Sequence, residues 1–110
     1  MKVELGSPGE GKAWHHIVEQ SQIEKSGFTS NEVNNINNVI AIPHGKGTVH
    51  AKISGYYSSI PASNFTNGLT VRQWLSGQSF QQQFDFGMDV LKKYGDVTET
   101  RNGWQFIPFE

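Results

Sequence analysis

Two adjacent histidines, His15 and His16, lie at the end of a short apolar run with the sequence AWHHIV. Neutral imidazole binds divalent metal ions, and its pKa near neutrality also allows it to accept a proton from water. Neighbouring residues of a regular strand point to opposite faces, so we expect the two rings to have different roles. One would bind a metal ion while the other activates water. His50 is a candidate second ligand for the same ion.

The composition restricts what such a metal site can contain. The chain has 110 residues with four histidines and no cysteine, so disulfides and thiolate ligands are excluded. Any metal ion must be held by His, Asn, Asp or Glu. The net charge of −1 argues against extensive phosphate contact, although a bound metal ion adds positive charge locally.

The segments around the histidines predict the elements that position them. The runs AWHHIV and NVIAIP (residues 38–43) are short and β-branched and predict two strands, with a polar loop or a helical turn between them. The run VHAKISGYYSSI predicts a helix with Thr48 as N-cap and His50 in its first turn. Asn38 is expected to tie the intervening loop with its amide and to orient the base, with Asn37 as its nearest competitor.

Two capping boxes predict further helices. Thr70 with Gln73, and Ser79 with Gln82, have the spacing at which a hydroxyl and an amide side chain cap a helix reciprocally. The second of these helices carries an apolar stripe with helical spacing. We expect this stripe to lie in the core together with two tryptophans: Phe80, Phe84, Met88, Leu91, Trp14 and Trp74.

The end of the chain predicts a short hairpin, because Asn102 and Gly103 stand between two β-like runs. The elements together predict a mixed α+β fold. Residues 1–10 are predicted to be a flexible linker, residues 11–95 a single small domain, and residues 96–110 an extension that contains the hairpin. No apolar run approaches the length that spans a membrane.

Three stretches, WHHIVEQ, NNVIAIP and VHAKISGYYSS, resemble in this order the His–Asn–His pattern of the HNH nucleases, the endonuclease VII or ββα-metal (His-Me finger) superfamily. The WHH start resembles in particular the toxin domains at the C-termini of bacterial polymorphic toxins. The resemblance covers residues 11–93. It implies an α+β fold with a ββα-metal, treble-clef-like core and additional C-terminal helices.

The resemblance also assigns roles to individual residues. It implies that His15 is the first metal ligand, His16 the general base, Asn38 the loop-orienting asparagine and His50 the ligand on the helix. The implied reaction is hydrolysis of a phosphodiester with one divalent metal ion. Mg²⁺ is the expected ion, with Zn²⁺, Ni²⁺ or Mn²⁺ as alternatives.

The sequence departs from the family pattern at one ligand position. Some members have a further histidine one turn along the helix, where this chain has Ser54. His44, in a loop with two glycines, is a candidate replacement and equally a loop histidine without a ligand role. Glu19 is a candidate partner that orients one of the histidines.

The resemblance implies a nucleic-acid substrate, with DNA favoured over RNA, and a cognate immunity protein as partner. It also implies delivery from a bacterium as part of a larger toxin that acts in the cytoplasm of the target cell. Candidate phosphate contacts are Lys46, Lys52 and Arg72. Three alternatives remain: an RNA-directed nuclease, an inactive relative that keeps the fold, and a non-catalytic binding module whose histidines hold a structural zinc ion.

Overall fold

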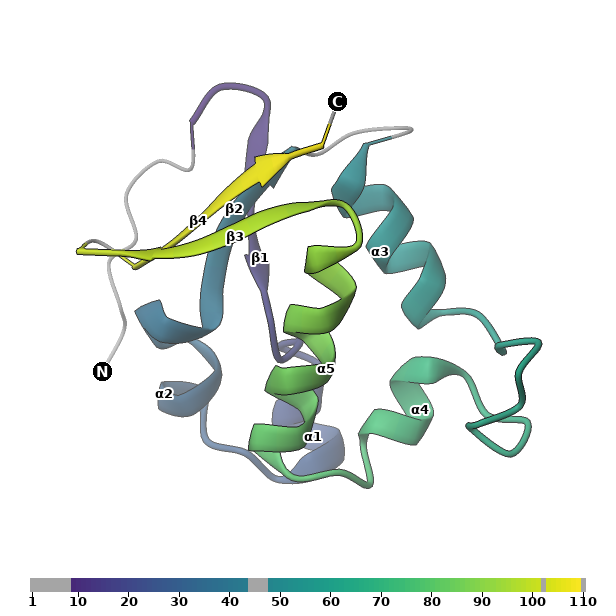
Figure 1. The fold of residues 1–110 in the computed structure, drawn as a ribbon. Helices are drawn as coiled ribbons and strands as arrows, with labels where there is room; N and C mark the ends of the chain where they lie inside the picture. Colours follow the sequence, from purple (N-terminus) through teal and green to yellow (C-terminus); the bar gives the residue numbers. More distant parts are fainter. Residues whose placement is uncertain (1–8, 44–47, 102, 110) are drawn as a thin grey trace.

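The computed structural model describes residues 9–43, 48–101 and 103–109, which form a four-stranded mixed sheet and five α-helices (Figure 1). The predicted mixed α+β class is therefore confirmed. The strands are β1 (Lys12–His16), β2 (Val39–Pro43), β3 (Gly95–Thr100) and β4 (Gly103–Pro108). The α-helices are α1 (Gln22–Ser26), α2 (Ser30–Val33), α3 (Val49–Tyr57), α4 (Val71–Leu75) and α5 (Phe80–Lys92), and a 3₁₀ turn η1 (Ile36–Asn38) precedes β2.

The first half of the chain forms a strand–strand–helix unit. β1 and β2 pair in antiparallel fashion, with His15 opposite Ile40 and His16 opposite Val39. The polar segment between these strands folds into α1, α2 and η1, where the sequence predicted a loop or one helical turn. Helix α3 follows β2, as predicted. Thr48 occupies its N-cap, but the Thr48 side chain does not accept the capping hydrogen bond from the helix.

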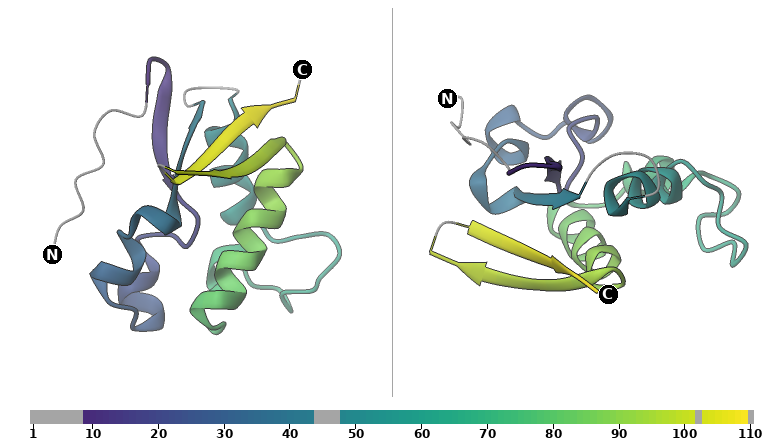
Figure 2. Two further views of the ribbon diagram at one scale, coloured as in Figure 1. Left: turned by 60° about the vertical axis from the view of Figure 1, so that its left-hand side comes forward. Right: turned by 90° about the horizontal axis from the view of Figure 1, so that it is seen from above.

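The C-terminal hairpin completes the sheet. β3 and β4 pair in antiparallel fashion, and β4 also pairs in parallel with β2 through Trp104 and Ile40. The resulting strand order is β1-β2-β4-β3, so the last strand of the chain lies inside the sheet. Figure 2 shows the hairpin lying across the molecule next to β2. The residues predicted as an extension thus share one sheet with β1 and β2.

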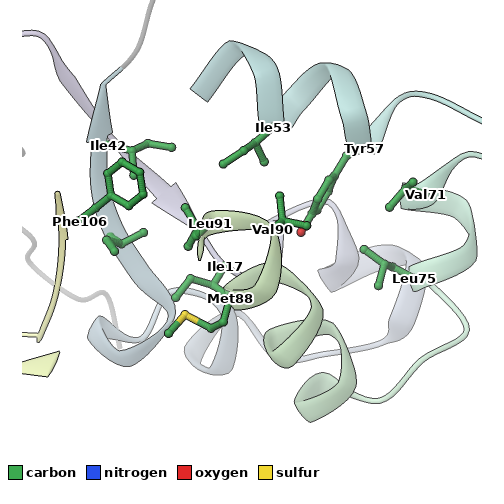
Figure 3. Close-up of a cluster of buried hydrophobic side chains, with 11 residues drawn as sticks. Ile17, Ile42, Ile53, Tyr57, Val71, Leu75, Met88, Val90, Leu91 and Phe106 are labelled. Carbon is green, nitrogen blue, oxygen red and sulfur yellow. The ribbon is translucent and has the colours of Figure 1, made fainter. Parts of the chain in front are cut away.

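Helix α5 lies centrally, with α3 and α4 to one side and α1 and α2 to the other (Figures 1 and 2). Both predicted capping boxes are present, at the starts of α4 and α5. The core around α5 includes Ile17, Ile42, Ile53, Tyr57, Met88, Leu91 and Phe106 (Figure 3). Of the predicted apolar stripe, Met88 and Leu91 are buried, whereas Phe80 and Phe84 are partly exposed. Both predicted core tryptophans, Trp14 and Trp74, are half-buried.

Helix α5 approaches the end of β1 very closely at Gly87. A Cβ atom at this position would lie 2.6 Å from the backbone oxygen of Ile17 and 2.9 Å from Ile17 Cγ2. Because a side chain cannot fit in this space, glycine is what allows the helix to pack directly behind the segment that follows His16.

Candidate active site

The segment after β1 is held by the amide of Asn38, which is buried at the end of η1. Asn38 Oδ1 accepts a hydrogen bond from the backbone N–H of Val18 at 2.8 Å, and Asn38 Nδ2 donates to the backbone oxygens of Val18 at 3.0 Å and Val33 at 2.8 Å. The backbone N–H of Ile17 donates to Asn38 O at 2.7 Å. Three of these hydrogen bonds tie the chain leaving β1 to the start of β2 and so fix the strand end that carries both histidines, and the fourth ties the end of α2 to the same asparagine.

His15 belongs to β1, and its ring lies against the ring of His50, which is in the first turn of α3. The two ring centroids are 5.9 Å apart and the ring planes are nearly perpendicular, at 86°. His15 is 7% exposed, and no atom of the described residues forms a hydrogen bond with its Nε2. A buried ring nitrogen without a partner is costly, so this atom is a candidate ligand for a group that the polypeptide does not itself supply.

Burial also determines the protonation state of His15. Desolvation, followed by the nearby His50 and His16, lowers the pKa of His15 from 6.5 to about 4. The ring is therefore neutral at physiological pH and keeps the lone pair that metal binding requires.

His16 is held by a residue that the sequence did not single out. His16 Nε2 lies 3.0 Å from Asn34 Oδ1, and Gln20 Nε2 donates to the same oxygen at 3.0 Å. Because an amide oxygen only accepts hydrogen bonds, this geometry places the hydrogen of a neutral His16 ring on Nε2 and leaves the lone pair on Nδ1. Burial lowers the pKa of His16, with the hydrogen bond to Asn34 acting in the opposite direction, so a proton-accepting form prevails at neutral pH.

Asn38 was expected both to tie the loop and to orient the base, but the structure divides these two roles between two asparagines. Asn38 ties the loop, whereas Asn34, in the C-cap position of α2, contacts the ring of His16. Both residues belong to the Asn-rich run NEVNNINN. Asn38 stands out there because it directly precedes a predicted strand, whereas nothing in the sequence marks Asn34 as the contact of His16.

The histidines line an open cavity of about 190 Å³ at the end of β1. Its lining residues are Trp14, His15, His16, Glu19, Gln20 and His50. Trp14, expected in the core, therefore borders the candidate site.

Glu19 was expected to orient one of the histidines, but its carboxylate is paired with Arg72. Its carboxylate accepts from Arg72 Nε at 2.7 Å and from Arg72 Nη2 at 2.8 Å, and Arg72 Nη1 donates to Ser58 Oγ at 2.7 Å. This two-point ion pair joins the loop after β1 to α4 and to the end of α3. Glu19 raises the pKa of Arg72, so the guanidinium stays charged.

The remaining predicted residues are not brought into this cavity. Lys52 is exposed on α3, two residues after His50, and does not line the cavity. Arg72 is already paired with Glu19. His44 and Lys46 lie outside the described residues.

A divalent ion is the group that the resemblance implies, and two features of these residues fit it. The buried Nε2 of His15 has no partner among the described residues, and the ring of His50 is close enough for two imidazoles to share one ion. Within the described ranges, no group of three or more His, Cys, Asp or Glu side chains could hold a metal ion. His15 and His50 are therefore the pair around which a site would be built.

The buried neutral state of His15 predicts that the metal-free protein loses stability in acid. The unfolded chain takes up a proton near pH 6.5, whereas folded His15 does so only near pH 4. The stabilising contribution of the neutral ring is therefore complete above pH 6.5, falls as the pH is lowered, and is lost at pH 4 and below. Since each pKa unit is worth about 1.4 kcal/mol, the free energy of unfolding should fall by about 3 kcal/mol over this interval.

Urea unfolding in EDTA at several pH values measures this effect. Between pH 6.5 and 5, where few carboxylates titrate, the pH dependence should become much weaker in His15→Leu, and what remains is the contribution of His16, whose pKa burial also lowers. An unchanged pH dependence in this variant would show that His15 is not held neutral by burial.

In the parts of the chain that the structure describes, no helix is long and apolar enough to cross a membrane. No family model, no curated protein and no solved structure matches this chain.

Proposed function

We propose that the protein is a metal-dependent endonuclease that hydrolyses phosphodiester bonds, with β1, β2 and α3 acting as a ββα-metal unit. The observation that carries the proposal is the arrangement of three histidines around one cavity. His15 Nε2 is buried and has no partner among the described residues, and the His15 ring lies against the ring of His50. His16 Nε2 beside them is engaged by Asn34. A ligand pair next to a neutral, oriented imidazole is what metal-assisted hydrolysis requires.

In this proposal each side chain has a defined task. His15 and His50 would bind the divalent ion, which when bound supplies positive charge to the transition state and to the departing oxygen. His16 Nδ1 would accept the proton of the attacking water while Asn34 keeps the ring in the tautomer that this step needs. Asn38 would hold the strand end so that His15 and His16 keep their places.

Mg²⁺ is the proposed physiological ion, with Zn²⁺, Ni²⁺ and Mn²⁺ as alternatives that imidazole ligands also accept. DNA is the proposed substrate, favoured over RNA by the sequence resemblance. Lys52 is the exposed cation nearest in sequence to His50 and is proposed to contact a phosphate. Arg72 is better suited to hold Glu19 at the edge of the cavity, because its guanidinium is already bound.

The biological setting is proposed from the sequence resemblance. The WHH start supports a role as the toxin domain of a larger bacterial protein, delivered into a competing cell and neutralised in the producer by an immunity protein. The net charge of −1 leaves little attraction for DNA beyond the site itself. We therefore expect cleavage to depend strongly on the bound ion and only weakly on ionic strength.

Cleavage of a supercoiled plasmid by the purified protein tests the proposal, with an RNA transcript as second substrate. We expect conversion to nicked or linear DNA in Mg²⁺, or in Mn²⁺, Ni²⁺ or Zn²⁺, and no conversion in EDTA. Re-addition of the ion after EDTA should restore the activity, which shows that cleavage requires the ion. Purification under denaturing conditions, followed by refolding, guards against a contaminating nuclease. Intact plasmid and intact RNA with all four ions would overturn the proposal.

A further inference from the structure

A second cavity, larger than the one at the histidines, lies on another part of the surface. It is an open groove of about 420 Å³ between α2 and η1 on one side and α5 and the β3–β4 hairpin on the other. We call it the acidic aromatic groove, and its lining residues are Glu32, Asn35, Asn37, Asn38, Phe80, Gln81, Phe84, Glu99 and Trp104. None of the residues that line the histidine cavity is among them.

Aromatic rings form the apolar part of this groove. The rings of Phe84 and Trp104 lie 6.2 Å apart, centroid to centroid, and are tilted by 49°. Trp104 Nε1 donates a hydrogen bond to Asn37 O at 2.8 Å, which fixes the edge of the indole. Phe80 packs edge-on against Phe28 at 5.3 Å. The rings are thus held in place by the protein, and all three are only partly buried.

The charged residues of this groove have one sign. Glu32 and Glu99 are exposed, and no lysine or arginine is among the described residues that line the groove. Glu32 Oε1 accepts hydrogen bonds from the backbone N–H and the hydroxyl of Thr29, both at 3.0 Å, which holds the carboxylate in place and lowers its pKa. The remaining polar groups are amides. This charge disfavours a nucleic-acid backbone and favours a cation.

We propose that the acidic aromatic groove binds an arginine side chain presented by an extended segment of a protein partner. A guanidinium stacks on aromatic rings and donates to carboxylates in the same plane, so it meets both kinds of group in the groove. Another aromatic groove beside α5 serves as a comparison, and its lining includes Tyr56, Phe65, Trp74 and Phe86. It contains one acidic residue, Asp89, and one basic residue, Lys93, so its charge does not favour a cation. The proposal concerns binding alone and does not depend on the nuclease activity.

The test uses small peptides of defined charge. The probe is acetyl-Gly-Arg-Gly-amide, and its neutral counterpart carries citrulline, which keeps the shape of arginine without the charge. Titration of the isotope-labelled protein is followed by NMR at the Trp104 indole N–H. We expect saturable shifts with the arginine peptide and at least about fivefold weaker binding of the citrulline peptide.

A double variant, Glu32→Gln with Glu99→Gln, removes the charges with little structural change. Glutamine preserves the capping box at the start of α2, and Glu99 is exposed. This variant should bind the arginine peptide at least about fivefold more weakly. The matched control Glu24→Gln, at an exposed position of α1, should bind like the wild type.

Three results would overturn the proposal. These are equal binding of the arginine and citrulline peptides, equal binding by the double variant and the wild type, and shifts at Tyr56 and Trp74 without any at Trp104. Binding of a thymidine oligonucleotide that moves the Trp104 signal would identify the groove as a nucleic-acid site instead.

Discussion

Replacement of His16 by alanine should lower the rate of plasmid cleavage by about 10²–10⁴-fold, the range that a positioned general base contributes. The folded structure and the affinity for the metal ion should be retained. His16 is not one of the two proposed ligands, and Asn34 keeps its hydrogen bond from Gln20 when the imidazole is gone. Initial rates of nicking at saturating Mg²⁺, with metal affinity measured by calorimetry, separate these two effects.

His50→Ala is the matched comparison. It also removes an imidazole from this cavity, but the imidazole that it removes is a proposed metal ligand, whereas His16 is the proposed base. This variant should lose metal binding and cleavage together. A His16→Ala protein that cleaves at the wild-type rate would contradict the assignment of His16 as the base. If His16→Ala instead loses the metal ion or the fold, the histidines would form a structural zinc site, which is the binding-module alternative.

The elements with local signals could be predicted from the sequence. The capping boxes of α4 and α5 depend on residues three positions apart, and the strand β2 is a short β-branched run that ends at Pro43. The two strands of the terminal hairpin likewise lie close together in the sequence, and Asn102, expected in the turn between them, lies outside the described residues. In each of these cases, the physical cause of the element lies within a few residues of it.

The arrangement of the sheet could not be predicted in the same way. β4 pairs with β2, more than sixty residues earlier in the chain, and the register is carried by a single residue pair, Ile40 with Trp104. No local pattern encodes such a pairing, because it accompanies burial of Ile40, Ile42 and Phe106 from the two strands in one hydrophobic core. The ion pair between Glu19 and Arg72 is another contact of this kind.

In the candidate site, too, some residues could be identified from the sequence and others depend on how distant segments pack. Chemical type alone singled out His15, His16 and His50, and the structure places them around one cavity. The role of Asn34 depends on where α2 ends relative to His16, and this is set by the folding of the segment between β1 and β2. Asn38 was identified because it directly precedes a recognisable strand. Whether the three histidines form a ββα-metal site stays a prediction.

Replacement of Gly87 by alanine should destabilise the protein by about 1–3 kcal/mol, the usual cost of inserting a methyl group into a well-packed interior. The new Cβ would lie 2.6 Å from the backbone oxygen of Ile17. Ile17 cannot easily move away, because its own N–H is bonded to Asn38 O at 2.7 Å. Helix α5 would have to shift, and the gain in helix propensity, about 1 kcal/mol, offsets only part of the cost. Urea unfolding measures the change.

Gly55→Ala is the control, because Gly55 is also a helical glycine, in α3, but it is exposed. Apart from its chain neighbours and the backbone of its own helix, no atom lies within 4 Å of a Cβ at this position. This variant should be more stable than the wild type by up to about 1 kcal/mol, since alanine favours the helix and meets no neighbour. The two substitutions are chemically identical and should change the free energy of unfolding in opposite directions. If Gly87→Ala is also stabilising, α5 does not pack directly against the segment after β1. The close support that this packing gives to His15 and His16 would then be absent.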